Sequence, residues 1–427
     1  MIPIASSPSL SNEKTAQLLQ ILTVLKDDKV PLPPKLSESF NAVLDAKKTL
    51  AEDSRVNDAV QGAQQTLIKE TYDFLRHTVD IEDEAIFLST KTIVETCPEF
   101  LATKDNFGKL PIHHAVFCAT ASFSKYFKLY IDVGLKHEIG GKDMRGGLLE
   151  KSFSGCVGLN YVRDPEIFEL LRQRSPPLFY VEDIKKFHIL HHVIEEGRNL
   201  NLVQYICNLD PSSIIQTNKN EQFPIQCFDW YDMGDKKVQE TLQYLIQTSM
   251  SHSSLNETIG CLFTLLQDDF DVIYMITHMV EMAEYCSGDV GAEAVWDCIE
   301  RALSKQREVD YLPCIMHQTI LHTPQHCAEV IKRFPNSVHL RDEKNMNRLP
   351  IHIALESGLK WSLELEYLIA TSQEYLKDVD PVTKCPPFVL AAMGTNCDLR
   401  TIYDLLHNHP EHVEMLEDSS GYKYIAL

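Results

Sequence analysis

The chain has 427 residues, more than one hydrophobic core usually supports, so we expect several domains or a row of repeated units. Its hydrophobic fraction of 44% is that of an ordinary folded protein, and its formal charge of −21 argues against nucleic acid and anionic membranes as partners. We find no secretory signal, no apolar run near the ~20 residues of a membrane span, and no CxxC pair among twelve cysteines. These features predict a cytoplasmic or nuclear protein that is not secreted.

Residues 1–80 contain three amphipathic tracts. Apolar residues recur at three- and four-residue spacing over residues 11–26, 37–50 and 55–79, the spacing of a helix that buries one face. Prolines between Pro31 and Pro34 end the first tract, because proline has no amide hydrogen to donate. We expect a helical cap or a small bundle here, with a partner-binding coiled coil as the alternative.

A short phrase recurs from about residue 81 onward. Residues 109–115 read KLPIHHA and residues 348–354 read RLPIHIA, each after an apolar stretch, a proline and an acidic-polar turn. Proline is favoured in the first turn of a helix, and a phrase that repeats at near-regular spacing indicates a stack of similar units. Further strong copies are anchored at Pro224 and Pro387, and weaker ones at Ile189 before His191, at Ile320 before His322, and near Leu148.

The phrase Leu-Pro-Ile-His-x-Ala resembles the Thr-Pro-Leu-His-x-Ala signature of ankyrin repeats, over about residues 85–427. The resemblance implies an all-α fold: a curved solenoid of stacked helix-turn-helix repeats with an N-terminal helical segment. In that family the histidine at the fourth place makes hydrogen bonds that join neighbouring turns. Leu110 and Leu349 stand where the family has threonine, so a side-chain cap is lost there. The residues to which the resemblance gives a structural role are Pro111, His113, His191, Pro224, Pro350, His352 and Pro387.

The phrase divides the chain into four segments. Residues 1–80 form the N-terminal helical segment, and ankyrin-like repeats occupy residues 81–240 and 316–427. Residues 241–315 are a divergent, acidic helical region, for which ankyrin-like repeats and pairs of the HEAT or TPR kind both remain open.

The histidines do not form a recognisable metal site. His188 and His192 are four residues apart, as zinc ligands on a helix can be, and His317, His322, His326 and Cys327 lie close in sequence. No third ligand follows at a characteristic distance, however. We therefore predict no catalytic residue, no cofactor and no metal, with an enzyme carrying a metal site near residues 300–330 as the rival interpretation.

Charge and resemblance together suggest where partners bind. Residues 251–300 carry ten acids and no Lys or Arg, which fits either a docking face for a basic segment of a partner or a solubilising ridge. By resemblance, hairpin tips and exposed helix faces contact partners. The residues so predicted are Lys104, Asp105, Asn106, His114, Asn218, Lys219, Asn220, Glu221, Asp342, Glu343, Asn345 and Glu356.

We accordingly expect a non-catalytic protein–protein interaction scaffold or adaptor. A regulatory subunit that inhibits or recruits one specific enzyme is the alternative.

Overall fold

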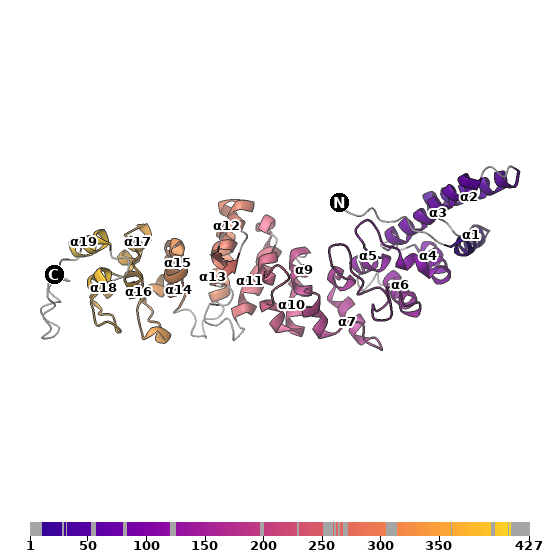
Figure 1. Ribbon diagram of the computed structural model, residues 1–427. Helices are drawn as coiled ribbons and strands as arrows, with labels where there is room; N and C mark the ends of the chain where they lie inside the picture. The colour runs from indigo at the N-terminus through magenta and orange to yellow at the C-terminus, as the bar shows by residue number, and fades with distance from the viewer. Residues whose placement is uncertain are drawn as a thin grey trace. The chain divides into compact units, whose positions relative to one another are not determined.

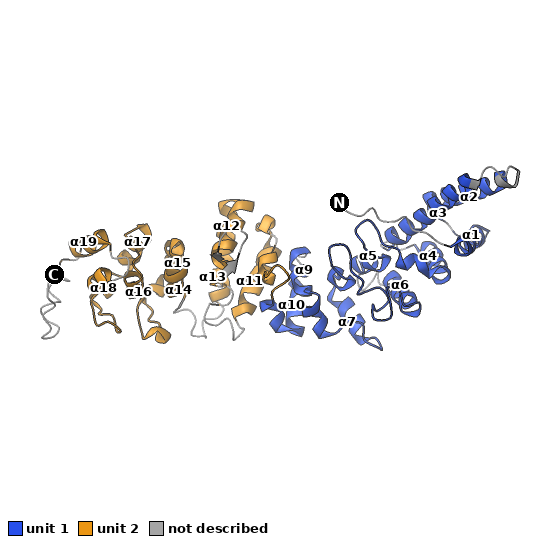
Figure 2. Cartoon of the chain, in the orientation of Figure 1, with its two compact units in different colours: residues 1–216 blue, residues 217–427 orange. Residues whose placement is uncertain are grey.

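Short helices make up almost all of the regular structure (Figure 1). The computed structural model describes residues 11–27, 30, 32–52, 57–79, 83–119, 125–196, 200–228, 230–250, 259, 262–263, 265–267, 272–304, 314–359, 361–393, 398–408 and 410. The chain divides into two compact units, residues 1–216 and 217–427 (Figure 2). Their boundary differs from the divisions predicted at residues 80, 240 and 315. None of the described helices is both long and apolar enough to cross a bilayer.

The first unit begins with the three predicted N-terminal helices, which are confirmed. The second of them begins at Pro34, three residues earlier than predicted, since proline is tolerated in the first turn of a helix. Figure 1 shows α2 and α3 side by side, and Phe40, Val43 and Leu67 are buried. The helices of the unit are α1 (Asn12–Asp27), α2 (Pro34–Glu52), α3 (Asn57–His77), α4 (Glu84–Thr96), α5 (Pro111–Cys118), α6 (Lys125–Lys136), α7 (Pro165–Gln173), α8 (Val181–Lys186), α9 (Ile189–Glu196) and α10 (Leu200–Leu209), with short 3-10 helices η2 (Pro98–Ala102), η3 (Gly158–Tyr161) and η4 (Pro211–Ile215).

Helices of the first unit contact elements that lie two or three places further along the chain. The helix α3 packs on α5, α5 packs on η3, and η3 packs on α9, while α4 packs on both α1 and α6. Within a pair, α5 contacts α6 and α9 contacts α10. From α4 onward the helices of this unit have 13 residues or fewer, so packing against neighbouring helices is needed to bury their apolar faces.

The second unit is ordered in the same way. The helices α14, α16 and α18 contact one another in succession, and α15 contacts α17 beside them. One short antiparallel hairpin, β1 (Leu265–Gln267) with β2 (Val272–Tyr274), was not predicted; it pairs Leu266 with Ile273. The helices are α11 (Lys236–Met250), α12 (Met275–Ser287), α13 (Asp289–Ser304), α14 (Cys314–His322), α15 (Cys327–Arg333), α16 (Pro350–Glu356), α17 (Leu363–Thr371), α18 (Pro387–Met393) and α19 (Leu399–Asn408), with 3-10 helices η5 (Pro224–Cys227), η6 (Trp230–Asp232), η8 (Pro324–His326), η9 (Pro335–His339), η10 (Glu343–Asn345) and η11 (Gln373–Lys377).

One hydrogen bond recurs at the start of these short helices. The side chain at the third helical position accepts from the backbone N–H of the residue just before the helix, a donor that would otherwise be unsatisfied. His352 Nδ1 accepts from Leu349 at 3.3 Å, and His113 Nδ1 accepts from Leu110 at 3.2 Å. Asn160, Asp183 and Gln226 make the same bond with their oxygens.

Some of these side chains also bond a backbone carbonyl 26 or 27 residues further along the chain. The Nε2 of His352 lies 3.0 Å from the carbonyl oxygen of Asp378, and Asn160 donates to the carbonyl of Phe187 at 2.9 Å. Because Nδ1 of His352 accepts, its proton must sit on Nε2, and the ring is neutral. Burial lowers the pKa of His352, which agrees with that tautomer. The side chain of His352 thus bonds the amide of the residue just before its own helix and the carbonyl of the residue that follows η11.

Two of the weaker predicted anchors need correction. Residues near Leu148 lie in turns, and the helical turn of that region begins at Gly158 instead. The predicted anchor at Ile320 falls near the end of α14, where His317 and not His322 is buried and lies 2.9 Å from the carbonyl of Arg348. His191 does occupy the third position of α9 and is buried.

A buried ion pair stabilises the second unit between α16 and the turn before α18. Arg348 donates from Nε to Asp380 at 2.8 Å, and both side chains are almost fully buried. The other carboxylate oxygen of Asp380 accepts from the N–H and hydroxyl of Thr383. Burial raises the pKa of Asp380, but the bonds from Thr383 and the charge of Arg348 outweigh it, so the net pKa lies below the usual value.

The substitution Asp380→Asn should destabilise this part of the second unit by up to about 3–5 kcal/mol, since the buried Arg348 guanidinium then keeps only the more exposed Glu356 carboxylate as its charge partner. Hydrogen exchange of peptides from residues 342–391 measures this loss. In the wild type the same protection should persist above about pH 4 and decline as the pH falls, because the folded pKa of Asp380 is depressed.

The matched control is Asp378→Asn, which removes a carboxylate from a more exposed pair with Arg341. It should cost about 1 kcal/mol or less. Equal losses of protection in the two variants would contradict the role given to the buried pair.

Candidate functional site: a groove in the first unit

Two adjoining cavities form a groove in the first unit. The smaller has a volume of about 150 Å³ and is lined by residues from α5, η3, α9 and α10, while the larger, more open one has about 520 Å³. They share the four lining residues Asn160, Tyr161, His192 and Glu196. We call these two adjoining cavities together the groove.

The floor of the groove is set by η3. Here the segment Val157-Gly158-Leu159-Asn160 stands where the clear copies read Leu-Pro-Ile-His. The amide of Gly158 donates to the carbonyl of Leu148 at 2.7 Å, a bond that proline could not make, and a Cβ on Gly158 would lie 2.7 Å from that carbonyl oxygen. Glycine is required at this close approach.

Two phenylalanines stand exposed at the open end of the groove. Phe107 is 69% exposed and Phe153 is 52% exposed, although both belong to residue types that are usually buried. We call the turn at residues 105–108 the hairpin tip. It is held to Phe153, whose backbone amide donates to the carbonyl of Phe107 at 2.9 Å. Gly108 has a φ of +75°, and a Cβ there would lie 2.7 Å from the Phe153 nitrogen.

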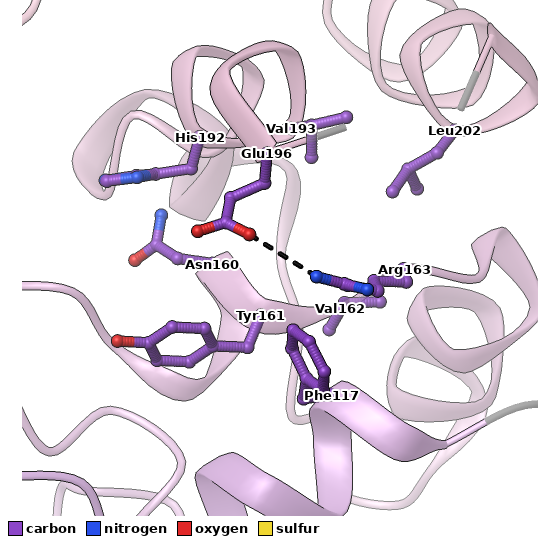
Figure 3. Close-up of a pocket in the computed structure, with 9 residues that line it drawn as sticks. All are labelled: Phe117, Asn160, Tyr161, Val162, Arg163, His192, Val193, Glu196 and Leu202. Atoms are coloured by element: carbon purple, nitrogen blue, oxygen red, sulfur yellow. Dashed lines mark hydrogen bonds and ion pairs between the residues drawn. The ribbon is translucent and has the colours of Figure 1, made fainter. Parts of the chain in front are cut away.

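Charged side chains line both cavities of the groove, and Figure 3 shows those of the smaller one. Arg163 lies 3.4 Å from the Glu196 carboxylate, and its guanidinium stacks 3.6 Å above the Phe117 ring. Lys109 lies 4.2 Å above the ring of Tyr161. Glu195 and Glu196 both extend into solvent from the last turn of α9, so the groove combines apolar rings with two carboxylates that lie beside the cations of Arg163 and Lys109.

A thiol and an imidazole meet within the groove. Cys156 Sγ lies 3.5 Å from His192 Nε2, and the carboxylate of Glu195 lies 3.5 Å from His192 Nδ1. Burial raises the pKa of Cys156, but hydrogen bonds with His192 and Ser154 outweigh it and lower the net pKa. Burial lowers the pKa of His192, but the bond and charge of Cys156 and the charge of Glu195 raise it overall. Both shifts favour a thiolate beside an imidazolium.

The predicted contact residues around the hairpin tip divide into two kinds. Asp105 is buried, contrary to the expectation for an exposed tip, because its carboxylate accepts from the amides of Phe107 and Lys109 at 2.8 Å. His114 is half-buried against Asp105, with Nε2 at 3.1 Å from the carboxylate, and Lys104 pairs with Glu150. Asn106 is exposed and lines the groove.

The tips of the second unit repeat this arrangement. Asn218 accepts from the amides of Asn220 and Gln222, and Asp342, which is buried, accepts from Lys344. These side chains stabilise their own turns. The residues left exposed are Lys219, Asn220, Glu221 and Glu343; Asn345 is half-buried, and Glu356 is exposed but paired with Arg348.

The acidic segment is partly neutralised within the chain. Arg333, whose side chain is only 6% exposed, lies within 3.1 Å of carboxylates of Glu293, Asp297 and Glu300, all on α13. Burial lowers the pKa of Arg333, but these partners and Glu329 raise it overall. Of the ten acids counted in the segment, Glu257, Asp268, Asp269 and Asp271 fall outside the described residues.

Sequence neighbours that suggested metal ligands are separated by packing. His326 lies 3.2 Å from the hydroxyl of Thr277 and against the ring of Trp296, while His322 packs on Tyr274. Burial raises the pKa of Cys327 to about 12. In the described part of the chain, no three His, Cys, Asp or Glu side chains come together as metal ligands would.

Comparison with protein-family models and with curated proteins gave no match for this chain. The groove must therefore be interpreted from its own chemistry.

Replacing the buried carboxylate of the hairpin tip tests how Phe107 is positioned. Asp105→Ala leaves two backbone amides without their acceptor and should cost about 1–3 kcal/mol in local stability. Faster hydrogen exchange over residues 103–110 reports this loss. The adjacent Asn106→Ala is the control and should leave exchange nearly unchanged; if both variants exchange alike, Asp105 does not organise the tip.

Proposed function

We propose that the protein is a non-catalytic interaction scaffold or adaptor, built as a solenoid of ankyrin-like repeats. The support for the solenoid is the order of helix contacts, in which each pair packs on the next within a unit. The recurring bond from the third helical position adds to it, since it closes one helix and, at His352 and Asn160, reaches the following turn. Stacked repeats present extended surfaces suited to binding other proteins.

The groove of the first unit is the proposed binding surface. The observation that carries this proposal is the pair of exposed rings, Phe107 and Phe153, beside the carboxylates of Glu195 and Glu196. Aromatic side chains in a partly enclosed site supply most of the energy of many interfaces, and flanking charges select the partner. The matching partner is a protein segment with an aromatic or aliphatic residue next to Lys or Arg.

The negative edge of α12 is a second, weaker part of this proposal. Glu281, Glu284 and Asp289 are exposed, whereas the acids of α13 have Arg333 as an internal partner. A basic partner segment would therefore meet α12 and the first residue of α13, a narrower face than residues 251–300 as a whole.

Selection of peptides from a random display library, followed by fluorescence anisotropy, tests the groove directly. The selected peptides should combine an apolar residue with a basic one. The double variant Phe107→Ala and Phe153→Ala should weaken their binding by about tenfold or more, because each ring contributes roughly 1–2 kcal/mol at a buried contact.

The control is Leu88→Ala, which shortens another exposed apolar side chain of the first unit outside the groove. Binding should be unchanged in this variant. Peptides that bind the double variant as well as the wild type would exclude the groove as their site.

A further inference from the structure

Cys156 differs from the buried cysteines of the chain in both its surroundings and its access to solvent. Burial raises the pKa of Cys97 and Cys298 to about 11 and that of Cys207 to about 12. These thiols are almost completely buried and stay protonated near neutral pH. Cys156 is only partly buried, and it lines the larger cavity of the groove.

The groups around Cys156 are placed to hold a thiolate. His192 projects from α9 onto the sulfur at 3.5 Å, and Glu195, one turn further along the same helix, lies 3.5 Å from its other ring nitrogen. A carboxylate in this position favours the protonated imidazole, which in turn favours a negative sulfur. Glu196, Lys109 and Tyr161 are the other titratable groups that line this cavity, and Glu196 has Arg163 as its partner.

We propose that Cys156 is a modification site, where the thiolate paired with His192 reacts with a small hydroperoxide that enters through the groove. The sulfur attacks the distal oxygen of the peroxide, so that an S–O bond forms and the O–O bond breaks. The departing oxygen takes the proton of the His192 imidazolium and leaves as water or an alcohol. Cys156 is oxidised by two electrons to a sulfenic acid, and the peroxide is reduced by the same two electrons.

The reaction requires only the groups present and the peroxide. The open cavity of about 520 Å³ lets a molecule as small as hydrogen peroxide reach the sulfur. It does not require a protein partner in the groove, so the modification can be measured on the isolated chain and is independent of the proposed binding function.

Site-resolved labelling of the full-length protein tests this inference. The protein is exposed to hydrogen peroxide in the presence of dimedone, which traps sulfenic acids, and each cysteine is then quantified by mass spectrometry. Cys156 should be labelled about tenfold or more faster than Cys97, Cys207 or Cys298, because each unit of pKa changes the thiolate fraction tenfold. Labelling of Cys156 no faster than these buried thiols would overturn the proposal without any variant being made.

Two histidine variants test whether the reactivity of Cys156 depends on the His192 imidazole or only on the exposure of the sulfur. His192→Asn should slow the labelling of Cys156 by about tenfold, since it removes the cation that stabilises the thiolate. His137→Asn, an exposed histidine at the end of α6, is the control and should change nothing. Labelling that is fast and unaffected by His192→Asn would show that exposure alone determines the reactivity.

Discussion

Every short helix in this chain begins with backbone amides that have no partner inside the helix. At five helix starts the chain satisfies one of them with the side chain at the third helical position, whether that side chain is histidine, asparagine, aspartate or glutamine. Where the same side chain has a second polar atom pointing onward, as in His352 and Asn160, it also bonds the next turn. Short helices gain little from propensity alone, so this bond and the packing between pairs must maintain them.

In the polar turns before these helices, side chains also satisfy backbone amides. Asp105, Asn218 and Asp342 each use a side-chain oxygen to accept from an amide two residues ahead. These residues identify the turns in the sequence, but their side-chain oxygens are already hydrogen-bonded within the turn. The side chains that remain exposed at the tip are therefore those of neighbours such as Asn106 and Phe107.

The sequence predicted the repeated Pro-x-His starts and the three N-terminal helices, because proline, apolar spacing and polar turns are local signals. It could not place the helical turn at Gly158, since glycine there replaces the proline and Asn160 replaces the histidine. The structure explains the glycine, because the Gly158 amide donates to the Leu148 carbonyl at 2.7 Å and proline has no amide hydrogen to donate. The groove was missed for a similar reason. Phe107, Phe153 and His192 are far apart in sequence and meet only when α5, η3 and α9 pack together.

The most direct test concerns His352, which makes both bonds at once. Hydrogen exchange should be compared in His352→Gln and His352→Leu, because Gln226 and Asn160 show that an amide side chain can accept the same bond. The leucine variant should lose protection both in α16 and in the turn near Asp378, and the glutamine variant should recover much of it. Loss confined to α16, or equal loss in the two variants, would contradict the view that this side chain joins one helix to the next.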